Sequence, residues 1–291
     1  WLLAMRDSRA VFIFQVVLNS LNIILDILFV QGFGWDVRGV AGATVIADYS
    51  GVVLGWFLMQ PHLKRLGGTW RGIGLFDRAQ LARLMKINGD IFIRTMALTS
   101  AFALFTSFSA RFGEVTLAAN AVLQNFLMFG SFALDGFAHA AETLVGQAYG
   151  AEKRKQFLWA VRKTTVWGIV SALVMAALFA ASGPWIIDAL TSIPEVRAAS
   201  YEYLMWAVVL PITGVLGFQF DGVFLGAMQT KHWRNMMLLS VAIYAGFAWW
   251  AVVMGSNHFL WAAFNGFFLL RGLTLAVLFP TIIPKQRQAV A

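Results

Sequence analysis

The sequence predicts an all-α polytopic membrane protein, and three observations support this fold class. Of its 291 residues, 59% are hydrophobic and 12% are charged, with a mean hydropathy of +0.71, whereas a soluble domain averages about 25% charged residues. Its apolar runs reach the roughly 20 residues that a bilayer-spanning helix needs. Its basic residues concentrate in alternate loops. These properties exclude an ordinary cytosolic enzyme, a disordered chain and a coiled coil.

Apolar runs between charged breaks define the expected helices. We predict about eight transmembrane helices, with bounds near 10–32, 38–60, 88–112, 116–149, 157–190, 198–228, 233–255 and 258–283. The second is rich in glycine and alanine between Val40 and Gly55, which favours close helix packing in lipid. The fourth and fifth are long enough to tilt or to extend beyond the hydrocarbon. Pro211 in the sixth removes a backbone hydrogen bond, so we expect a kink or hinge there.

The distribution of charge predicts the orientation. Five segments carry 17 of the 22 lysines and arginines, and the four loops between them carry at most one each. This alternation follows the positive-inside rule and predicts a multi-pass protein of the plasma membrane, here a bacterial inner membrane, with both termini of this chain cytoplasmic. We therefore attribute the net charge of +8 to topology, and we do not expect nucleic acid as a partner.

Several common chemistries are absent from the sequence. There is no cysteine, and His62, His232 and His258 show no metal-ligand spacing, so we expect neither a metal nor a cofactor. The phosphate-binding pattern GxxxxGK[ST] does not occur, so any transport would draw its energy from an ion gradient.

An internal repeat predicts the domain organisation. The helix pair within 10–60 resembles the pair within 233–283, and both pairs begin on the same side of the membrane, as in a parallel repeat. If the complete unit has six helices, residues 1–60 are the last two helices of an N-terminal lobe, 61–87 a basic cytoplasmic inter-lobe linker, 88–284 a complete C-terminal lobe and 285–291 a cytoplasmic tail. We therefore expect about four further helices upstream in the whole protein, which makes the missing part of the N-terminal lobe a candidate partner.

Short stretches along nearly the whole chain resemble a known family. The run Leu21–Phe29, followed by Gly34-Trp35 and Gly39–Ala43, looks like the fifth and sixth helices of multidrug and toxic compound extrusion (MATE) transporters. The stretches 117–122 and 145–151 resemble the borders of their eighth helix. The stretch 134–142 is similar to the DNA-damage-inducible, DinF-like branch.

This resemblance implies a fold and an activity. It implies a MATE-like helical bundle with twelve transmembrane helices in two six-helix lobes, of which about eight are present here. It also implies export of amphipathic, often cationic, organic compounds in exchange for H⁺ or Na⁺ by alternating access. On this resemblance the partners are small organic substrates and the lipid bilayer, and an acidic residue on the first helix, important for coupling in proton-driven relatives, would precede this chain.

One side of the predicted helix 116–149 carries polar residues at spacings of 7, 4, 4 and 3. They are Gln124, Ser131, Asp135, His139 and Glu142. At 100° per residue they stay within about 40° of one line, over about 27 Å. Polar groups of this kind do not face lipid. We therefore expect this stripe to line a water-filled cleft or to pack against polar groups of neighbouring helices.

Acids on two other helices are expected at a depth comparable to that of Glu142. We predict a cluster of Asp90, Arg94, Glu142 and Asp221, with Asp135 and His139 deeper in the membrane. In such a cluster, protons and cationic substrates compete for the same negative charge, as an exchanger requires. Together with Gln124, these acids and His139 are the candidate cation- and substrate-binding residues.

Other polar or small residues receive structural assignments. For Arg94 and Arg271 we favour ion pairs that neutralise carboxylates within the membrane. Asn22 and Asp26, which share a face of the first helix, are expected to satisfy backbone groups or the next helix. The family-like pair Gly146 and Gln147 is assigned to packing.

Three alternatives remain open at this stage. A lipid-linked oligosaccharide flippase of similar architecture would present a basic cleft to a diphosphate headgroup. A non-transporting fragment would need its missing N-terminal helices before it could act. An intramembrane hydrolase would use Asp135 and Glu142 as acid and base, but we expect no enzymatic activity.

Overall fold

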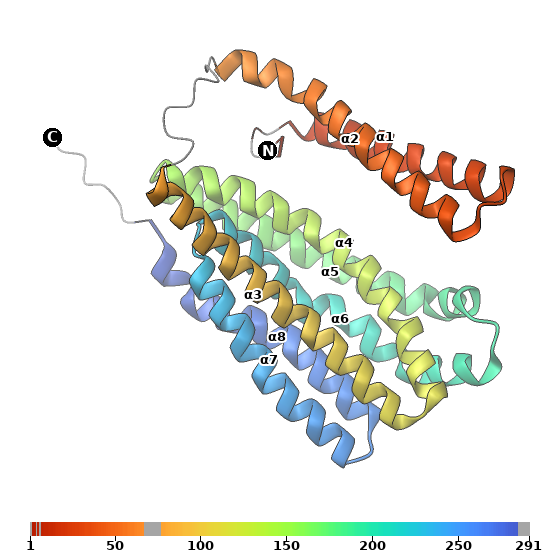
Figure 1. Cartoon of the computed structure of the whole chain (residues 1–291). Helices are drawn as coiled ribbons and strands as arrows, with labels where there is room; N and C mark the ends of the chain where they lie inside the picture. Colours follow the sequence, from red (N-terminus) through yellow and green to blue (C-terminus); the bar gives the residue numbers. More distant parts are fainter. Residues whose placement is uncertain (1, 4, 6, 67–76, 285–291) are drawn as a thin grey trace. The chain divides into compact units, whose positions relative to one another are not determined.

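The computed structural model describes all residues except 1, 4, 6, 67–76 and 285–291. Its described residues contain eight helices that are long and apolar enough to cross a membrane, and this confirms the predicted all-α polytopic fold (Figure 1). The chain divides into two compact units, residues 1–77 and 78–291. Much of the predicted linker, at 67–76, and the predicted tail, at 285–291, lie outside the described residues.

The helices follow the predicted order, with differences at their ends. They are α1 (Ser8–Ile27, continued by the π-helical turn η1, Leu28–Gly32), α2 (Asp36–Leu66), α3 (Arg78–Ser109, followed by the 3₁₀ turn η2, Ala110–Phe112), α4 (Glu114–Gly150), α5 (Arg154–Leu190), α6 (Pro194–Gly226), α7 (Thr230–Val253) and α8 (Asn257–Ile282). The helix α2 ends at Leu66 rather than near 60, and α3 begins at Arg78 rather than near 88. Charged residues continue both helices beyond their apolar runs, and Lys64 and Arg65 complement the dipole at the end of α2.

The first unit is a helical hairpin whose two helices approach closely. Its helix α2 buries four small residues at every fourth position: Gly39, Ala43, Ala47 and Gly51. A Cβ atom at Gly51 would lie 2.6 Å from the end of the Leu18 side chain of α1, so any larger residue would require that leucine to move. The small-residue stripe thus gives the close packing that the composition of this region predicts.

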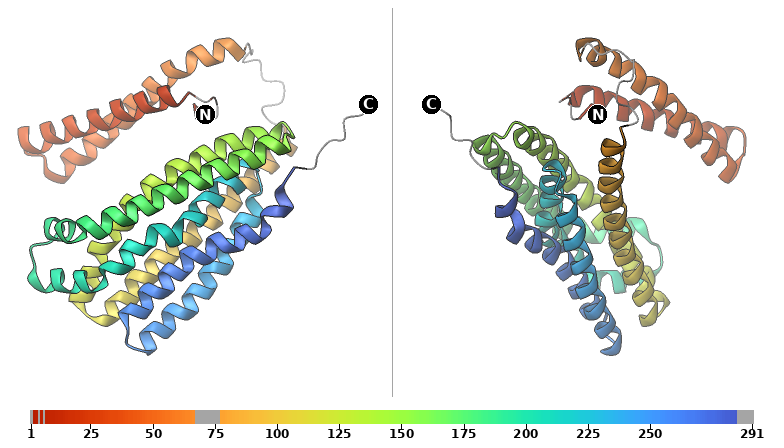
Figure 2. Two further views of the ribbon diagram at one scale, coloured as in Figure 1. Left: turned by 180° about the vertical axis from the view of Figure 1, so that it is seen from behind. Right: turned by 60° about the vertical axis from the view of Figure 1, so that its left-hand side comes forward.

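The second unit is a six-helix bundle built around α6. This helix packs against α4, α5, α7 and α8, and 56% of its most apolar window is buried, the largest share among the eight spans. Apart from a few polar residues such as Gln219 and Asp221, its side chains are apolar on all sides, a pattern typical of a helix enclosed by others. Figure 2 shows the six helices of this unit from two further directions.

Two glycines of α6 allow its closest contact, which is with α4. A Cβ atom would lie 2.1 Å from the Ala138 carbonyl oxygen if added at Gly222, and 2.5 Å from the Glu142 carbonyl oxygen if added at Gly226. The two glycines are four residues apart, the spacing of the GxxxG motif of membrane helix pairs. This contact fixes α4, and with it the side chains of its polar stripe, against the centre of the bundle.

A buried amide network joins α3, α4 and α8 near one end of this bundle. The Asn120 amide nitrogen donates to Ser109 and to Asn257, each at 2.8 Å, and the Asn120 oxygen accepts from the Trp261 indole at 2.8 Å. All four residues are buried. Satisfied polar networks of this kind specify which helices pair, so Asn120 is structural.

Candidate functional site

Three groups of charged side chains contain the residues of the predicted site. The first surrounds Asp221 on α6, the second surrounds Asp90 on α3, and the third is the polar stripe of α4. The sequence predicts one cluster of Asp90, Arg94, Glu142 and Asp221. The structure pairs Arg94 with Asp221 as predicted, but it gives Asp90 and Glu142 other partners.

Asp221 is neutralised by partners from three other helices. Its Oδ2 accepts hydrogen bonds from Arg94 of α3 and from Arg271 of α8, the latter at 2.8 Å. Its Oδ1 accepts from the Trp233 indole of α7 at 2.7 Å. The side chain of Asp221 is 12% exposed and that of Arg271 only 2%. The Nε atoms of Arg94 and Arg271 are buried without a hydrogen-bond partner among the described residues. The bonds to Asp221 therefore carry most of the compensation for these buried charges, and they tie α3, α6, α7 and α8 together.

Aromatic rings complete the surroundings of the two arginines. The Arg94 guanidinium lies 4.6 Å from the centroid of the Trp233 ring. The Arg271 guanidinium lies 5.0 Å from the Phe218 ring and 5.5 Å from the Phe268 ring. Such cation–π contacts partly replace the lost hydration of each arginine. The two arginines therefore share one carboxylate, whereas the sequence predicts a carboxylate for each.

Asp90 forms the second group, with partners that the sequence did not predict. Its Oδ1 accepts from Arg234 of α7 at 2.5 Å, and its Oδ2 accepts from the Thr230 hydroxyl at 2.8 Å. Arg234 stands at the border of a span and counts as a topology signal in the sequence. The useful signal was the spacing of Thr230 and Arg234, which places both on one side of the first turn of α7.

The polar stripe of α4 has different surroundings. The Asp135 side chain is half-buried and forms no hydrogen bond or ion pair with another described residue. The His139 and Glu142 side chains are 60% and 40% exposed, and His139 Nδ1 lies 3.5 Å from Glu142 Oε2. Gln124, near the start of the stripe, is half-buried. The acids of this stripe are therefore open to solvent or ligand and lack an arginine partner among the described residues.

The stripe runs along the edge of the buried face of α4. The buried face includes Leu134, Ala138 and Val145, which lie about 60–100° around the helix from Asp135. The opposite side carries Phe129, which is 58% exposed and lies about 120° from Asp135 in the other direction. The acids thus separate a packed protein face from an apolar outer face.

Asp135 connects the stripe electrostatically to the Asp221 group. It lies within electrostatic reach of Arg94, Arg271 and Asp221. Two arginines and Asp221 together carry a charge of +1, and an ionised Asp135 balances it. Protonation of Asp135 would leave one positive charge in excess.

The remaining predicted residues occupy packing positions. Gly146 of α4 faces the backbone of α6, because an added Cβ would lie 3.2 Å from the Gly226 oxygen, and its neighbour Gln147 is half-buried. Pro211 is buried inside α6, which continues through it; whether it acts as a hinge stays a prediction. Pro211 has no backbone N–H, so the Ala207 carbonyl of α6 loses its helical hydrogen bond. The Asn265 amide donates to the adjacent Trp206 carbonyl at 3.4 Å.

In the first unit, Asn22 bonds to the next helix as predicted, whereas one oxygen of Asp26 lacks the predicted partner, and Asp7, which was not predicted, caps α1. The Asn22 amide donates to the Thr44 hydroxyl of α2 at 3.4 Å, while one carboxylate oxygen of Asp26 is buried without a hydrogen-bond partner among the described residues. Asp7 caps α1, accepting from the Ala10 amide at 2.9 Å, and lies 2.8 Å from His62 of α2. The Ala10 amide and then His62 lower the pKa of Asp7 below its ordinary value.

Comparisons with known proteins identify the family. The family model MatE matches residues 91–250. DNA damage-inducible protein F of Escherichia coli is 38% identical over 280 residues, which cover 96% of this chain and 60% of that protein. Protein DETOXIFICATION 42 of Arabidopsis thaliana is 26% identical over 244 residues, 82% of this chain and 45% of that protein. The chain therefore spans about 60% or less of the length of these relatives.

Solved structures share the fold. A mutant of the Vibrio cholerae MATE transporter VcmN gives a TM-score of 0.88 at 18% identity, covering 98% of this chain and 65% of that one. A MOP superfamily transporter from Pyrococcus furiosus gives 0.81 at 20% identity, covering 96% and 64%. These likenesses agree with the family match and confirm the resemblance seen in the sequence. The chain is a multi-pass membrane protein that belongs to the MATE family.

Proposed function

We propose that the protein is part of a secondary active efflux transporter that exchanges H⁺ or Na⁺ for amphipathic organic cations by alternating access, in the bacterial inner membrane with both chain ends cytoplasmic. One observation carries the proposal. The acids of the α4 stripe are partly exposed and have no arginine partner among the described residues, in contrast to Asp221 and Asp90. Carboxylates in a membrane span are costly, and unpaired ones mark ion and substrate pathways.

The charges around Asp135 give the proposed exchange a physical basis. With Asp135 ionised, the Arg94–Asp221–Arg271 group and Asp135 are neutral together, and the Glu142 carboxylate adds a negative charge along the stripe. A cation, whether Na⁺ or the positive group of a substrate, is then attracted to the stripe. Protonation removes that attraction and leaves an excess of positive charge, which expels the cation. Proton and substrate therefore compete for the same carboxylates.

The flippase alternative requires basic side chains that are free to bind a diphosphate. The two arginines inside the bundle, Arg94 and Arg271, are both engaged by Asp221. This arrangement favours the cation exchanger over the flippase. The remaining alternative is that this chain needs the missing N-terminal helices before it can transport. The assay below tests it by comparing the chain alone with the chain plus those helices.

The test is efflux of ethidium, a planar organic cation, from proteoliposomes with an imposed pH or Na⁺ gradient. The chain is assayed alone and together with the part of the E. coli relative that its alignment leaves uncovered. The double variant Asp135→Asn/Glu142→Gln should abolish gradient-driven efflux. The control Glu195→Gln removes an exposed acid at the start of α6 and should leave efflux unchanged. Unaltered coupling in the double variant would refute the assignment of the site.

A further inference from the structure

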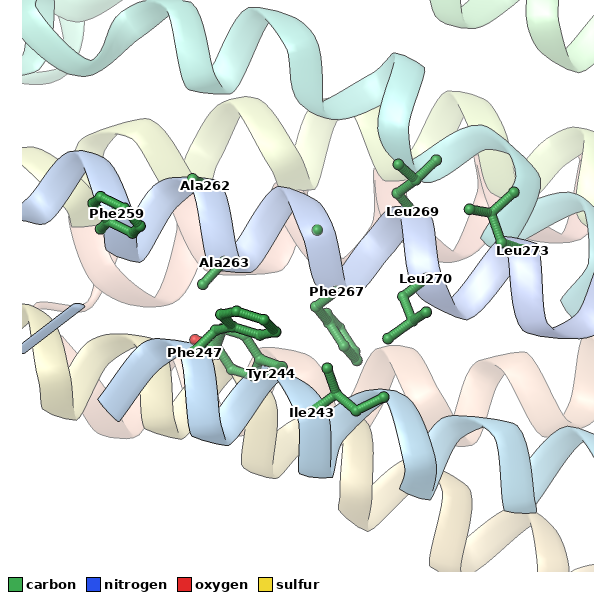
Figure 3. Close-up of a pocket in the computed structure, with 11 residues that line it drawn as sticks. Ile243, Tyr244, Phe247, Phe259, Ala262, Ala263, Phe267, Leu269, Leu270 and Leu273 are labelled. Carbon is green, nitrogen blue, oxygen red and sulfur yellow. The ribbon is translucent and has the colours of Figure 1, made fainter. Parts of the chain in front are cut away.

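A long apolar groove lies between α7 and α8, and its lining residues include none of the charged side chains of the proposed exchange. It has a volume of about 430 Å³ and is lined by side chains of both helices, including Ile243, Phe247, Phe259 and Leu273. Figure 3 shows these side chains along the two helices. Among the lining side chains only Tyr244 carries a polar atom, and its hydroxyl is buried without a hydrogen-bond partner among the described residues.

Small residues on α8 create this groove. Ala262, Ala263 and Gly266 follow one another on its lining face. No atom lies within 4 Å of the position that a Cβ would occupy at Gly266, and the backbone there is ordinary helix. The facing side chains of α7 do not fill this space, and Phe247 and Phe259 remain 51% and 47% exposed.

The dimensions of the groove indicate the shape of its occupant. From Phe259 to Leu273 it follows about 21 Å of α8, at 1.5 Å per residue. A volume of 430 Å³ over that length is narrow, which suits one extended hydrocarbon chain better than a compact ring system. Both helices are candidate membrane spans, so hydrocarbon is the medium that meets the groove.

One side of α7 connects the groove to a basic helix end. Leu239 and His232 precede Ile243 by 4 and 11 residues, which at 100° per residue returns to nearly the same side. Leu239 is 44% exposed. Lys231, next to His232 in the first turn but about 120° around the helix from Ile243, is exposed and forms no ion pair with another described residue. The distance along α7 from the groove at Phe247 to His232 is about 22 Å, close to the reach of one long acyl chain.

We propose that this groove binds one acyl chain of an anionic phospholipid, with the phosphate at Lys231 and His232 and the chain running along α7 into the space over Gly266. The apolar lining accommodates the chain, and the basic helix end selects the negative headgroup. The site is independent of the α4 stripe, so its failure would leave the proposed transport function untouched.

The test is lipid titration of the delipidated chain in detergent, followed by native mass spectrometry. The two probes are dioleoyl-phosphatidylglycerol and dioleoyl-phosphatidylcholine, which share their chains and differ in headgroup charge. The unaltered protein should bind one phosphatidylglycerol more tightly than phosphatidylcholine. Gly266→Leu fills the groove and should weaken the binding of both lipids about tenfold, which is about 1.4 kcal/mol. Lys231→Gln should weaken phosphatidylglycerol alone, by about fivefold.

The chain offers a matched control. Gly246 of α7 is also exposed, helical and free of atoms within 4 Å of its Cβ position, but it does not line the groove, so Gly246→Leu should bind lipid as the unaltered protein does. If Gly266→Leu fails to fold, Gly266→Ala serves in its place. Its side chain fills less of the groove, and it should also weaken binding. Unchanged affinity in the Gly266 variants, an equal loss in Gly246→Leu, or displacement of the lipid by ethidium would overturn the proposal.

Discussion

Asp221 and Glu142 are both acidic side chains within membrane-spanning helices, yet the structure gives them opposite surroundings. Asp221 exposes 12% of its side chain and accepts hydrogen bonds from two arginines and a tryptophan. Glu142 exposes 40% and has His139 as its neighbour at 3.5 Å. The difference teaches that the partner and the burial of a membrane carboxylate, rather than its presence in a span, separate a structural role from an exchangeable one.

The largest expected effect comes from removing the charge of Asp221. Asp221→Asn leaves two arginines without a carboxylate in hydrogen-bond contact, one of them with a side chain 2% exposed, so the free energy of unfolding should fall by about 3–5 kcal/mol. Denaturant unfolding in detergent measures this change. Glu142→Gln should change it by less than about 0.5 kcal/mol. Equal losses in the two variants would remove the distinction between the two acids.

A second variant tests whether close packing holds the α4 acids at the edge of the bundle. In Gly222→Ala the new Cβ would lie 2.1 Å from the Ala138 oxygen, so α4 and α6 must separate, at a cost of about 3 kcal/mol. Gly136→Ala on the same stretch of α4 meets no atom within 4 Å and should be neutral or slightly stabilising. The same unfolding measurement applies, and a stable Gly222→Ala would show that the α4–α6 contact is looser than described.

The Asp90 group should lie between the two extremes. Its partner Arg234 exposes 24% of its side chain, so water can solvate that arginine once the carboxylate is removed. Asp90→Asn should therefore cost about 1–2 kcal/mol, less than Asp221→Asn. Asp90 itself is only 5% exposed, so if Asp90→Asn proved the more damaging of the two, the exposure of the arginine partner would not be the property that ranks these acids.

The smallest expected effect is the pH dependence of the helix cap in the first unit. Because the Ala10 amide and His62 lower the pKa of Asp7 below 3.8, its stabilisation is present above about pH 3.8 and is lost as the pH falls through the folded-state pKa. Hydrogen-exchange protection at the start of α1, corrected for the intrinsic rate, should drop over that range. Asp7→Asn should flatten this profile, and an equally steep profile in the variant would assign it to other groups.

The eight helices could be predicted because span length and loop charge are local properties of the sequence. The helix ends could not be predicted in the same way. The end of α2 at Leu66 and the start of α3 at Arg78 lie in charged segments, which carry no hydropathy signal. The spacing of Gly222 and Gly226 is a local signal of a close helix contact that the predictions did not use, and it does not identify α4 as the partner helix.

The candidate site was predictable as a set of residues but not as a set of contacts. Arg94 and Asp221 are 127 positions apart, and local spacing does not indicate which arginine meets which acid. The α4 stripe was recognisable because its members share one helix face. Arg234 was missed because a basic residue at a span border has the same appearance whether it marks topology or pairs with a buried acid.

Water access to the α4 stripe tests the central claim most directly. The sequence has no cysteine, so single cysteines can be introduced at Asp135, Glu142 and Phe129 and treated in proteoliposomes with a membrane-impermeant thiol reagent, which reacts with the thiolate formed in water. We predict reaction at positions 135 and 142 at least about tenfold faster than at 129, which lies on the exposed apolar side of α4. Equally slow reaction at all three positions would contradict the account, because the acids would then face hydrocarbon or dry packing.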